Sequence, residues 1–329
     1  MSVDRQALFT KVARQALEAY GLADAPYTYL LHSENVTFKV DLPDGARLLR
    51  IHTPRTPLMG SHGSKTEMVE SELIWLEALR RETDLPVQQP VRNSDGQLVT
   101  RIRKGRRPFN CTLLEWLDGE PYQRALESEV TVAQLGDMIG TLHRFSSHWQ
   151  APANFTRPRR NRAYFRKALD ALRPTMEDGR ASYQDFKHLE TCVDLLTRMM
   201  RSLSKKGQAE GILHGDLHKG NFLYHQGQMR LIDFSMSAFG NYMFDLGVCL
   251  SDMNPVLHPV FLENYQKLMP LPPGYERLIE AFFLGSMIVT FSFWVTLPEG
   301  QEELVRKIPF IAQEYAARFN REEHFWFVT

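Results

Sequence analysis

The chain has 329 residues, of which 43% are hydrophobic and 24% are charged, a composition typical of folded globular proteins rather than disordered or fibrous ones. Its 39 Lys and Arg residues balance 39 Asp and Glu residues, so no overall charge argues for nucleic acid or a membrane surface as a partner. The three cysteines lie far apart and form no CxxC pair, which favours reduced thiols in the cytoplasm over disulfides or a zinc site. The first residues contain an early Asp and no apolar run, so we expect no signal peptide.

The chain begins with a helix pattern that is followed by a hairpin pattern. Apolar residues recur every four positions over residues 8–20 and Gly21 follows, which predicts an amphipathic helix with a C-terminal glycine. Apolar and polar residues then alternate over residues 36–42, and a second apolar run covers residues 46–51 after turn residues 43–45. These two runs predict an antiparallel hairpin.

A second helix and a second hairpin come next. Prolines and glycines between residues 53 and 64 indicate a loop, and helical spacing resumes over residues 67–82. Residues 98–103 and 109–117 predict another hairpin. Apart from a strand-like stretch near residues 212–234, the rest of the chain has helical patterns.

This order of elements predicts an α+β fold with two lobes. We expect a small N-terminal lobe, residues 1–117, with about five antiparallel strands and one inserted helix, and a larger, mainly helical lobe over residues 118–329. Residues 278–297 are mostly apolar and long enough to cross a bilayer. Because Glu280 and Ser286 interrupt this run, we interpret it as a buried helix and expect no membrane partner.

Two motifs in the C-terminal part carry the residue types of a phosphoryl-transfer site. The first is HGDLHKGN, residues 214–221, and the second is LIDFS, residues 231–235. They supply Asp216, Asn221 and Asp233, whose oxygens are of the hard type that binds Mg²⁺. Phosphoryl transfer needs a carboxylate that orients and deprotonates the attacking hydroxyl, and oxygen ligands that hold metal ions against the phosphate.

These motifs resemble the catalytic loop and the metal-binding Asp of the protein-kinase-like fold. They are similar in particular to those of the superfamily of aminoglycoside phosphotransferases, choline kinases and type II homoserine kinases. The resemblance implies a bilobal fold, ATP as the phosphoryl donor and Mg²⁺ as a cofactor. It also implies that Asp216 is the catalytic residue and that Asn221 and Asp233 bind the metal ions.

A different interpretation of the first motif is a zinc site. On an extended segment His214, Asp216 and His218 would face the same way and could chelate zinc in a hydrolase. That interpretation leaves Asn221 and Asp233 without a role, so we prefer the kinase interpretation. A purely structural role for the loop is the other alternative.

The resemblance also implies residues that contact the nucleotide. Arg50 stands on the strand that carries a phosphate-binding Lys in the superfamily, and its guanidinium can also bind phosphate oxygens; the alternative is a solvated Arg. Its ion-pair partner would be Glu72 on the following helix, with Glu70 as the competing candidate. At the nucleotide-covering loop, Ser33 and Asn35 stand where a glycine-rich sequence is expected.

Two further stretches resemble supporting parts of the superfamily's site. The sequence LLEWLDGEPY, residues 113–122, resembles the hinge whose backbone pairs with adenine, which implies contacts at Glu115 and Leu117. Asp245 matches an Asp that braces the catalytic loop from the start of a helix. His143 is expected to pack in the core rather than to act in catalysis.

The expected acceptor is a small molecule with a hydroxyl group rather than a protein. Only eleven residues separate Asp233 from Asp245 and no APE sequence follows, so the chain lacks a long activation segment that would hold a peptide. Candidate acceptors are metabolites, such as an amino alcohol or a hydroxy amino acid, and antibiotics. Six cations in residues 157–167 either favour an acceptor with a carboxylate or phosphate over a polycationic aminoglycoside, or form a solvated helix face.

The sequence leaves two other functions open. Because Arg50 replaces Lys and the glycine-rich loop is missing, the chain could be a pseudokinase or a nucleotide-binding regulatory protein without turnover. Some members of the fold class phosphorylate proteins, so an atypical protein serine/threonine kinase is a further alternative. We expect a cytoplasmic monomer or homodimer with no nucleic-acid partner.

Overall fold

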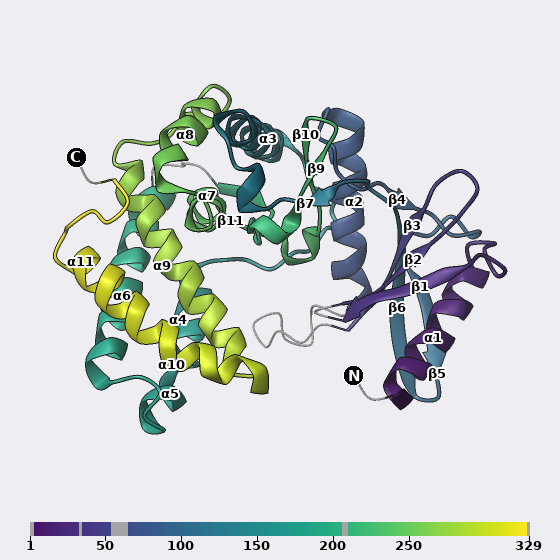
Figure 1. Cartoon of the computed structure of the whole chain (residues 1–329), viewed down its shortest axis with the longest axis horizontal. Helices are drawn as coiled ribbons and strands as arrows, with labels where there is room; N and C mark the ends of the chain where they lie inside the picture. The colour runs from purple at the N-terminus through teal and green to yellow at the C-terminus, as the bar shows by residue number, and fades with distance from the viewer. Residues whose placement is uncertain (1–2, 33–34, 54–64, 206–209, 328–329) are drawn as a thin grey trace. The chain divides into compact units, whose positions relative to one another are not determined.

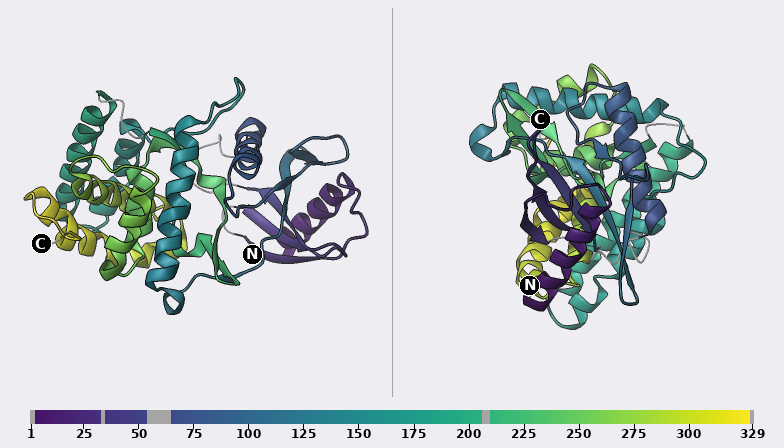
Figure 2. Two further views of the ribbon diagram at one scale, coloured as in Figure 1. Left: turned by 90° about the horizontal axis from the view of Figure 1, so that it is seen from above. Right: turned by 90° about the vertical axis from the view of Figure 1, so that its right-hand side faces the viewer.

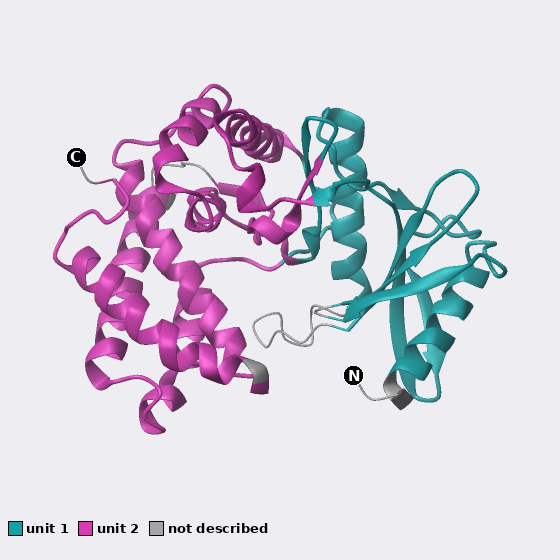
Figure 3. Ribbon diagram, viewed as in Figure 1, with its two compact units in different colours: residues 1–120, 150–157, 225–235 teal, residues 121–149, 158–224, 236–329 magenta. Residues whose placement is uncertain are grey.

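The computed structural model describes the chain except residues 1–2, 33–34, 54–64, 206–209 and 328–329 (Figure 1). The described residues form two compact units, which Figure 3 draws in teal and magenta. Unit 1 consists of residues 1–120, 150–157 and 225–235, and unit 2 consists of residues 121–149, 158–224 and 236–329. Unit 1 is therefore assembled from three separate stretches of sequence.

Unit 1 contains a six-stranded sheet and two long helices among its described residues. Its elements are α1 (Val3–Glu18), β1 (Tyr27–His32), β2 (Asn35–Val40), β3 (Arg47–His52), α2 (Thr66–Glu82), β4 (Pro90–Val91), β5 (Thr100–Lys104), β6 (Arg107–Glu115) and β10 (Gln228–Leu231). The sheet order is β1-β2-β3-β6-β4, with β5 also paired to β6, and these pairs are antiparallel. Both predicted helices and both predicted hairpins are confirmed. The predicted loop over residues 53–64 lies, from residue 54 on, outside the described residues.

Helix α1 lies along one face of this sheet (Figures 1 and 2). The helix and three central strands bury one apolar cluster: Phe9, Val12, Ala13, Ala16, Leu17, Val36, Phe38, Val40, Leu49, Ile51, Phe109, Cys111 and Leu113. Successive residues of a strand point to opposite faces of the sheet. Because Leu49 and Ile51 face the apolar cluster, Arg50 and His52 lie on the other face, which is where the polar chemistry of unit 1 is found.

Unit 2 is mainly helical. Its helices are α3 (Glu129–His148), α4 (Arg162–Asp170), α5 (Arg173–Glu177), α6 (Tyr183–Lys205), α7 (Met243–Ser251), α8 (His258–Gln266), α9 (Tyr275–Trp294), α10 (Gln301–Phe310) and α11 (Ala317–Asn320). Its short helical turns are η2 (Arg124–Leu126), η3 (Lys219–Asn221), η5 (Pro255–Leu257), η6 (Pro298–Gly300) and η7 (Ile311–Ala316). Strands β8 (Glu210–Leu213) and β11 (Ala238–Asn241) pair antiparallel. Three short elements lie where the chain passes from one unit to the other: β7 (Glu120–Pro121), β9 (Phe222–His225) and η4 (Phe234–Met236).

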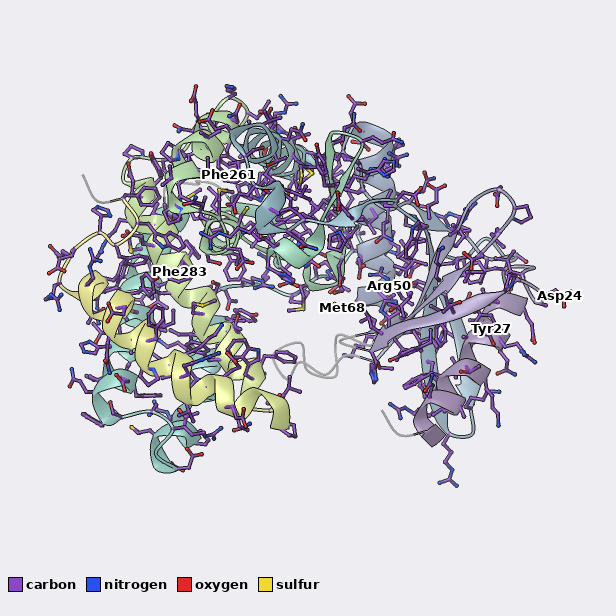
Figure 4. The ribbon with its side chains drawn as sticks, viewed as in Figure 1. Asp24, Tyr27, Arg50, Met68, Phe261 and Phe283 are labelled. Atoms are coloured by element: carbon purple, nitrogen blue, oxygen red, sulfur yellow. The ribbon has the colours of Figure 1, made fainter. Side chains whose placement is uncertain are left out.

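Helices α3 and α8 approach each other closely. Helix α3 begins at a capping box, in which the Ser128 hydroxyl accepts the backbone N–H of Thr131 at 3.3 Å. A Cβ at Gly136 of α3 would lie 2.5 Å from the backbone oxygen of Phe261 in α8, a residue labelled in Figure 4. The close approach of the two helices therefore requires glycine at this position.

Helix α9 is the one described helix that is long and apolar enough to cross a membrane. Most of its apolar window is buried within unit 2, and the core helix of a globular unit has the same length and composition. Its Glu280 is fully buried and accepts the backbone N–H groups of Phe325 at 2.7 Å and Trp326 at 2.9 Å. A buried carboxylate that holds the C-terminal segment favours the interpretation of α9 as a core helix.

Candidate active site

The catalytic-loop motif lies in unit 2, directly after β8. The amide nitrogen Nδ2 of Asn221 donates to the backbone oxygen of Asp216 at 2.7 Å and to its carboxylate oxygen Oδ2 at 3.0 Å. The structure thus brings together two of the predicted site residues and restrains the Asp216 carboxylate. Because both bonds use the nitrogen of Asn221, its carbonyl oxygen Oδ1 is the group left for a ligand.

Asp245, near the start of α7, holds the loop through its backbone N–H groups. Its Oδ2 accepts the N–H of His214 at 2.8 Å, and its Oδ1 accepts the N–H of Gly215 at 2.8 Å. Its Oδ2 also lies 3.1 Å from Nε2 of His143, a fully buried ring whose Nδ1 lies 2.9 Å from the Tyr265 hydroxyl. Burial raises the pKa of Asp245, but the hydrogen bond from His143, the charges of both histidines and the Gly215 N–H outweigh it and hold this pKa below its usual value.

His218 lies beside the Asp216 carboxylate. Its Nδ1 accepts the N–H of Gly220 at 3.0 Å, so the neutral ring carries its proton on Nε2, which is 3.5 Å from Oδ2 of Asp216. Burial raises the pKa of Asp216, but the hydrogen bond from His218 and the electrostatic interactions with His218, His214 and Arg160 outweigh burial and hold this pKa below its usual value. The lowered pKa keeps the carboxylate ionised at neutral pH, and its side chain, which is 39% exposed, can be reached by an incoming molecule.

The same contacts argue against a zinc site at the motif. Nδ1 of His214 accepts the N–H of Asp216 at 3.2 Å, and Nδ1 of His218 is used by Gly220. Within the described part of the chain, no three His, Cys, Asp or Glu side chains are arranged to hold a metal ion. The ring nitrogens instead shape the loop around Asp216.

In unit 1, Arg50 forms an ion pair with Glu72. Its Nη2 lies 2.6 Å from Oε1 of Glu72, and both side chains are buried, with 4% and 2% exposed. Its Nη1 lies 3.7 Å from Oδ1 of Asp233. The contact is therefore with Glu72 rather than Glu70, and the alternative of a solvated Arg50 is wrong. The Nε of Arg50 is buried and has no hydrogen-bond partner among the described residues.

Asp233 is held in an unusual backbone conformation by its surroundings. Its φ is 60°, in the left-handed region, and its Oδ1 accepts the N–H of Ser235 at 3.2 Å. The guanidinium of Arg157 donates to the backbone oxygen of Ser235 at 2.6 Å and to that of Met68 in α2 at 2.9 Å. Figure 4 labels Met68 and Arg50 in this part of unit 1. Arg157 thus ties the loop after Asp233 to α2.

The predicted hinge follows the end of β6. The N–H of Glu115 donates to the backbone oxygen of Gln89 at 2.8 Å, and its own oxygen accepts from the Gln88 side chain at 3.3 Å. Leu117 is partly exposed, and its backbone makes no hydrogen bond to other described residues. The N–H of Leu117 is therefore available to a ligand, whereas the Glu115 oxygen already has a weak partner.

The predicted nucleotide-covering loop is described in part. Ser33 lies outside the described residues. Asn35 is buried at the start of β2, where it is paired with His52 of β3. Adenine and phosphate contacts at this loop therefore stay predictions.

Sequence reasoning missed His52, which shares the polar face of β3 with Arg50. Its Nε2 lies 3.0 Å from the Thr112 hydroxyl on β6. Burial lowers the pKa of His52 well below its usual value, and the neighbouring charges of Arg50 and Arg157 lower it further. His52 lies one residue past the predicted strand of residues 46–51, and its two-residue spacing from Arg50 was the signal that could have found it.

The cationic run of residues 157–167 has neither of the two expected arrangements as a whole. Arg157 and Arg160 are buried and donate to backbone oxygens, and Arg166 is paired with Asp194. Arg159 is exposed and stacks on the ring of Phe239. Because the backbone takes up two of the six cations, the run is not an open cationic surface.

The donor chemistry fits a magnesium nucleotide. Mg²⁺ in phosphoryl-transfer sites is bound by one or two protein side-chain oxygens together with phosphate oxygens. Asn221 offers its Oδ1, and Asp233, whose side chain is 42% exposed, offers a carboxylate. The buried guanidinium of Arg50, with its unpartnered Nε, suits an anionic group.

Comparison with known proteins places this chain among phosphotransferases. Amicoumacin kinase of Bacillus subtilis (strain 168) is 23% identical to it over 292 residues, which is 83% of this chain and 80% of the relative. Homoserine kinase of Polaromonas naphthalenivorans (strain CJ2) is 21% identical over 232 residues, 64% of this chain and 65% of the relative.

Solved structures share the fold over nearly the whole chain. A microcompartment-associated aminopropanol kinase matches with a TM-score of 0.79 and 23% identity, over 95% of this chain and 98% of its own. An amicoumacin kinase, hAmiN, in complex with AMP-PNP and Ca²⁺ matches with a TM-score of 0.73 and 16% identity, over 98% of this chain and 94% of its own. The family model described as the phosphotransferase enzyme family matches residues 30–278, the range that holds both motifs, Arg50 and Glu72. The chain therefore belongs to the phosphotransferase enzyme family and has the α+β protein-kinase-like fold.

Proposed function

We propose that this protein is an ATP-dependent kinase that transfers the γ-phosphoryl group to a hydroxyl of a small molecule. The observation that carries the proposal is the restrained carboxylate of Asp216. It is ionised, reachable and fixed by Asn221 and His218, while Asp245 holds the backbone before it. A carboxylate in this state orients an alcohol for attack on phosphorus and receives its proton.

Each remaining site residue has a role in this proposal. Arg50, paired with Glu72, balances negative charge on the α and β phosphates. Asn221 and Asp233 are the proposed ligands of Mg²⁺, which when bound supplies positive charge to the phosphate oxygens. Within unit 1 the chain holds Arg50 against Glu72 and near Asp233, and within unit 2 it holds Asn221 against Asp216, before substrate arrives.

The nucleotide base and its cover involve backbone and small side chains in this proposal. Leu117 donates its N–H to the adenine edge, and Glu115 accepts from adenine through its backbone oxygen. The Gln88 side chain donates to that oxygen at 3.3 Å in the free protein, so this bond must break when adenine binds. Ser33 and Asn35 belong to the loop proposed to cover the phosphates.

We further propose that the acceptor is a small alcohol that carries a nitrogen group, either an amino alcohol or a hydroxy amino acid. Three of the similar proteins are named for such compounds: aminopropanol, homoserine and choline. Two of the six cations behind the expectation of an acceptor with a carboxylate or phosphate, Arg157 and Arg160, are engaged by backbone oxygens and do not support it.

We place the protein in the cytoplasm, as a monomer or homodimer. Cys111, Cys192 and Cys249 are all buried and free of disulfides. Burial raises the pKa of each thiol far above its usual value, so these cysteines pack as small apolar side chains. Three buried thiols without a disulfide suit a reducing compartment.

The test is phosphorylation of a defined panel by the purified protein. L-homoserine, 1-amino-2-propanol, choline, spectinomycin and kanamycin are each incubated with ATP and Mg²⁺, with ADP release and product mass as readouts. We expect phosphorylation of at least one nitrogen-bearing alcohol and its loss when EDTA removes the metal. Tight binding of Mg-ATP with no turnover on the panel would instead favour the pseudokinase function.

The matched variant for this test is Asp216→Asn. It keeps the shape of the side chain and an oxygen to accept from Asn221, so we expect a nearly unchanged fold and nucleotide affinity. Turnover should fall by about 10² to 10⁴, the usual range for a lost general base. Wild-type turnover by a clean Asp216→Asn preparation would contradict the role of Asp216.

A further inference from the structure

The backbone before Asp216 is held on its carbonyl side by a buried arginine. Nη2 of Arg160 donates to the backbone oxygen of Gly215 at 2.8 Å and to that of Met236 at 3.2 Å. On the opposite side, Asp245 accepts the N–H groups of His214 and Gly215. The backbone next to Asp216 is thus held by two charged side chains. The Asp245 carboxylate accepts its N–H groups, and the Arg160 guanidinium donates to its carbonyl oxygen.

The space around Gly215 is shaped by the same arginine. The φ of Gly215 is 84°, in the left-handed region that favours glycine. A Cβ at this position would lie 2.7 Å from Nη2 of Arg160 and 2.4 Å from the backbone oxygen of Met236. The glycine of the motif is therefore needed so that the guanidinium can reach the loop.

Arg160 is itself rigidly placed. It is 4% exposed, and its guanidinium carbon lies 4.2 Å from the ring centre of Phe244 in α7 and 5.4 Å from that of Tyr164 in α4. Its backbone N–H donates to the oxygen of Phe239 in β11 at 2.8 Å. Burying a cation is costly unless its donors are satisfied, and here two neutral carbonyls and two ring faces surround it.

We propose that Arg160 is a positioning residue for Asp216, which fixes the catalytic loop through the Gly215 and Met236 carbonyls. The proposal rests on the role of Asp216 in the proposed function. Loss of the guanidinium should therefore loosen the backbone that places Asp216.

The experiment compares Arg160→Met and Arg160→Lys with Arg159→Met as the matched control. Arg159→Met removes the same charge one residue away, from an exposed side chain that stacks on Phe239 and has no bond to the loop. Hydrogen exchange of the peptide that covers residues 212–217 is measured for each full-length variant. For an accepted member of the panel, kcat and the KM for ATP are measured as well.

We expect Arg160→Met to speed exchange of the His214 and Gly215 amides and to lower kcat about ten- to hundredfold, with little change in the KM for ATP. Arg160→Lys keeps a positively charged donor but loses the planar guanidinium, so it should recover only part of the wild-type exchange protection and of kcat. Arg159→Met should match the wild type.

Two results would overturn the proposal. One is wild-type exchange together with wild-type kcat in Arg160→Met. The other, which applies if Arg160→Met does not fold, is wild-type exchange together with wild-type kcat in Arg160→Lys. Failure of the proposed function has a different signature, since Asp216→Asn would then be as active as the wild type. The exchange measurement needs no acceptor, so it tests the positioning of the loop by itself.

Discussion

Asp233 has a left-handed backbone conformation that its neighbours hold in place. Non-glycine residues seldom adopt a φ of 60°, and such a conformation costs on the order of 1–3 kcal/mol unless the surroundings impose it. Here the Ser235 N–H holds the carboxylate, and Arg157 holds the Ser235 oxygen. The side chain remains 42% exposed, which is consistent with a ligand to a bound ion.

We predict that Asp233→Asn separates the backbone role of this residue from its metal role. Asn tolerates the left-handed region and can still accept the Ser235 N–H, so the melting temperature should stay close to that of the wild type. The neutral amide is a weaker ligand than a carboxylate, so Mg²⁺-dependent ATP binding should be lost or strongly reduced. Calorimetric titration of the variant with Mg-ATP measures this binding. If the variant bound Mg-ATP with the affinity of the wild type, Asp233 would have only a structural role.

We predict that Arg50 contributes to both stability and nucleotide use. Arg50→Met leaves Glu72 buried without its cation, which should cost about 3–5 kcal/mol of unfolding free energy. The folded fraction should lose about ten- to hundredfold in kcat/KM for ATP, the value of a hydrogen bond to a charged group. Arg50→Lys should recover part of both effects, because an ammonium keeps the charge and loses the planar fork.

The control for this prediction is Arg47→Met on the same strand. Arg47, whose side chain is 19% exposed, pairs with the largely exposed Asp44, and such a surface pair contributes about 0–1 kcal/mol. If Arg50→Lys had activity that the wild type lacks, the pseudokinase interpretation would be favoured over the kinase interpretation. Unchanged stability and kinetics in Arg50→Met would show that Arg50 does not take part in the proposed site.

At the scale of elements, the sequence predicts what depends on local pattern. Strand alternation predicted both hairpins, and the same alternation put Arg50 on the polar face of β3. The loop around Asp216 was predictable because its residue types and spacing are set by chemistry. The burial of Arg157 and Arg160 was not, because their partners are backbone oxygens at Ser235, Met236 and Gly215, and every residue type carries such an oxygen.

The contact between α3 and α8 predicts that Gly-to-Ala substitutions at two positions of α3 differ in their effect on stability. A Cβ at Gly136 would lie 2.5 Å from a backbone oxygen, whereas one at Gly140 would have its nearest contact at 3.1 Å, with the Leu268 side chain. Gly-to-Ala substitution in a helix gains up to about 1 kcal/mol, while overpacking costs about 1–3 kcal/mol. We therefore expect Gly136→Ala to destabilise by about 1–2 kcal/mol and Gly140→Ala to have an effect near zero, as measured by urea unfolding. Equal effects at both sites would contradict the close approach.

At the scale of the whole molecule, each unit contains a buried histidine that must stay neutral. Burial is the first cause of the lowered pKa of His52 in unit 1, and it is also the main cause of the lowered pKa of His258 in unit 2. In the unfolded chain both rings take up a proton near the ordinary pKa of about 6.5. The unfolded state therefore binds more protons below that pH, and stability falls as the pH falls.

We predict a loss of stability between pH 7.5 and pH 5.5, measured as the urea midpoint. Between pH 6.5 and pH 5.5 each histidine should lower the free energy of unfolding by about 1 kcal/mol. This value follows from a slope of about 1.4 kcal/mol per pH unit for each proton that only the unfolded state binds. His52→Asn and His258→Asn should each flatten the pH dependence while lowering stability at pH 7.5. Asp216 and Asp245 act in a lower window, because their lowered pKa values give stability above about pH 4 that is lost as the pH falls further. A wild-type midpoint that does not change between pH 7.5 and 5.5 would contradict the neutral state of both rings.

The discontinuous sequence of unit 1 has a consequence for synthesis of the chain. The segment that carries Asp233 also pairs with the N-terminal part through Leu231, whose N–H donates to the Pro86 oxygen, and through the ring of Phe234 against Trp75. A ribosome that adds about 5–20 residues per second needs on the order of ten seconds to extend the chain from residue 120 to residue 235. During that interval the sheet and α2 exist without the segment that completes them. A nascent chain halted before residue 235 would expose the apolar face of Trp75 to chaperones, and Arg50 would meet Asp233 only after most of the chain had been made.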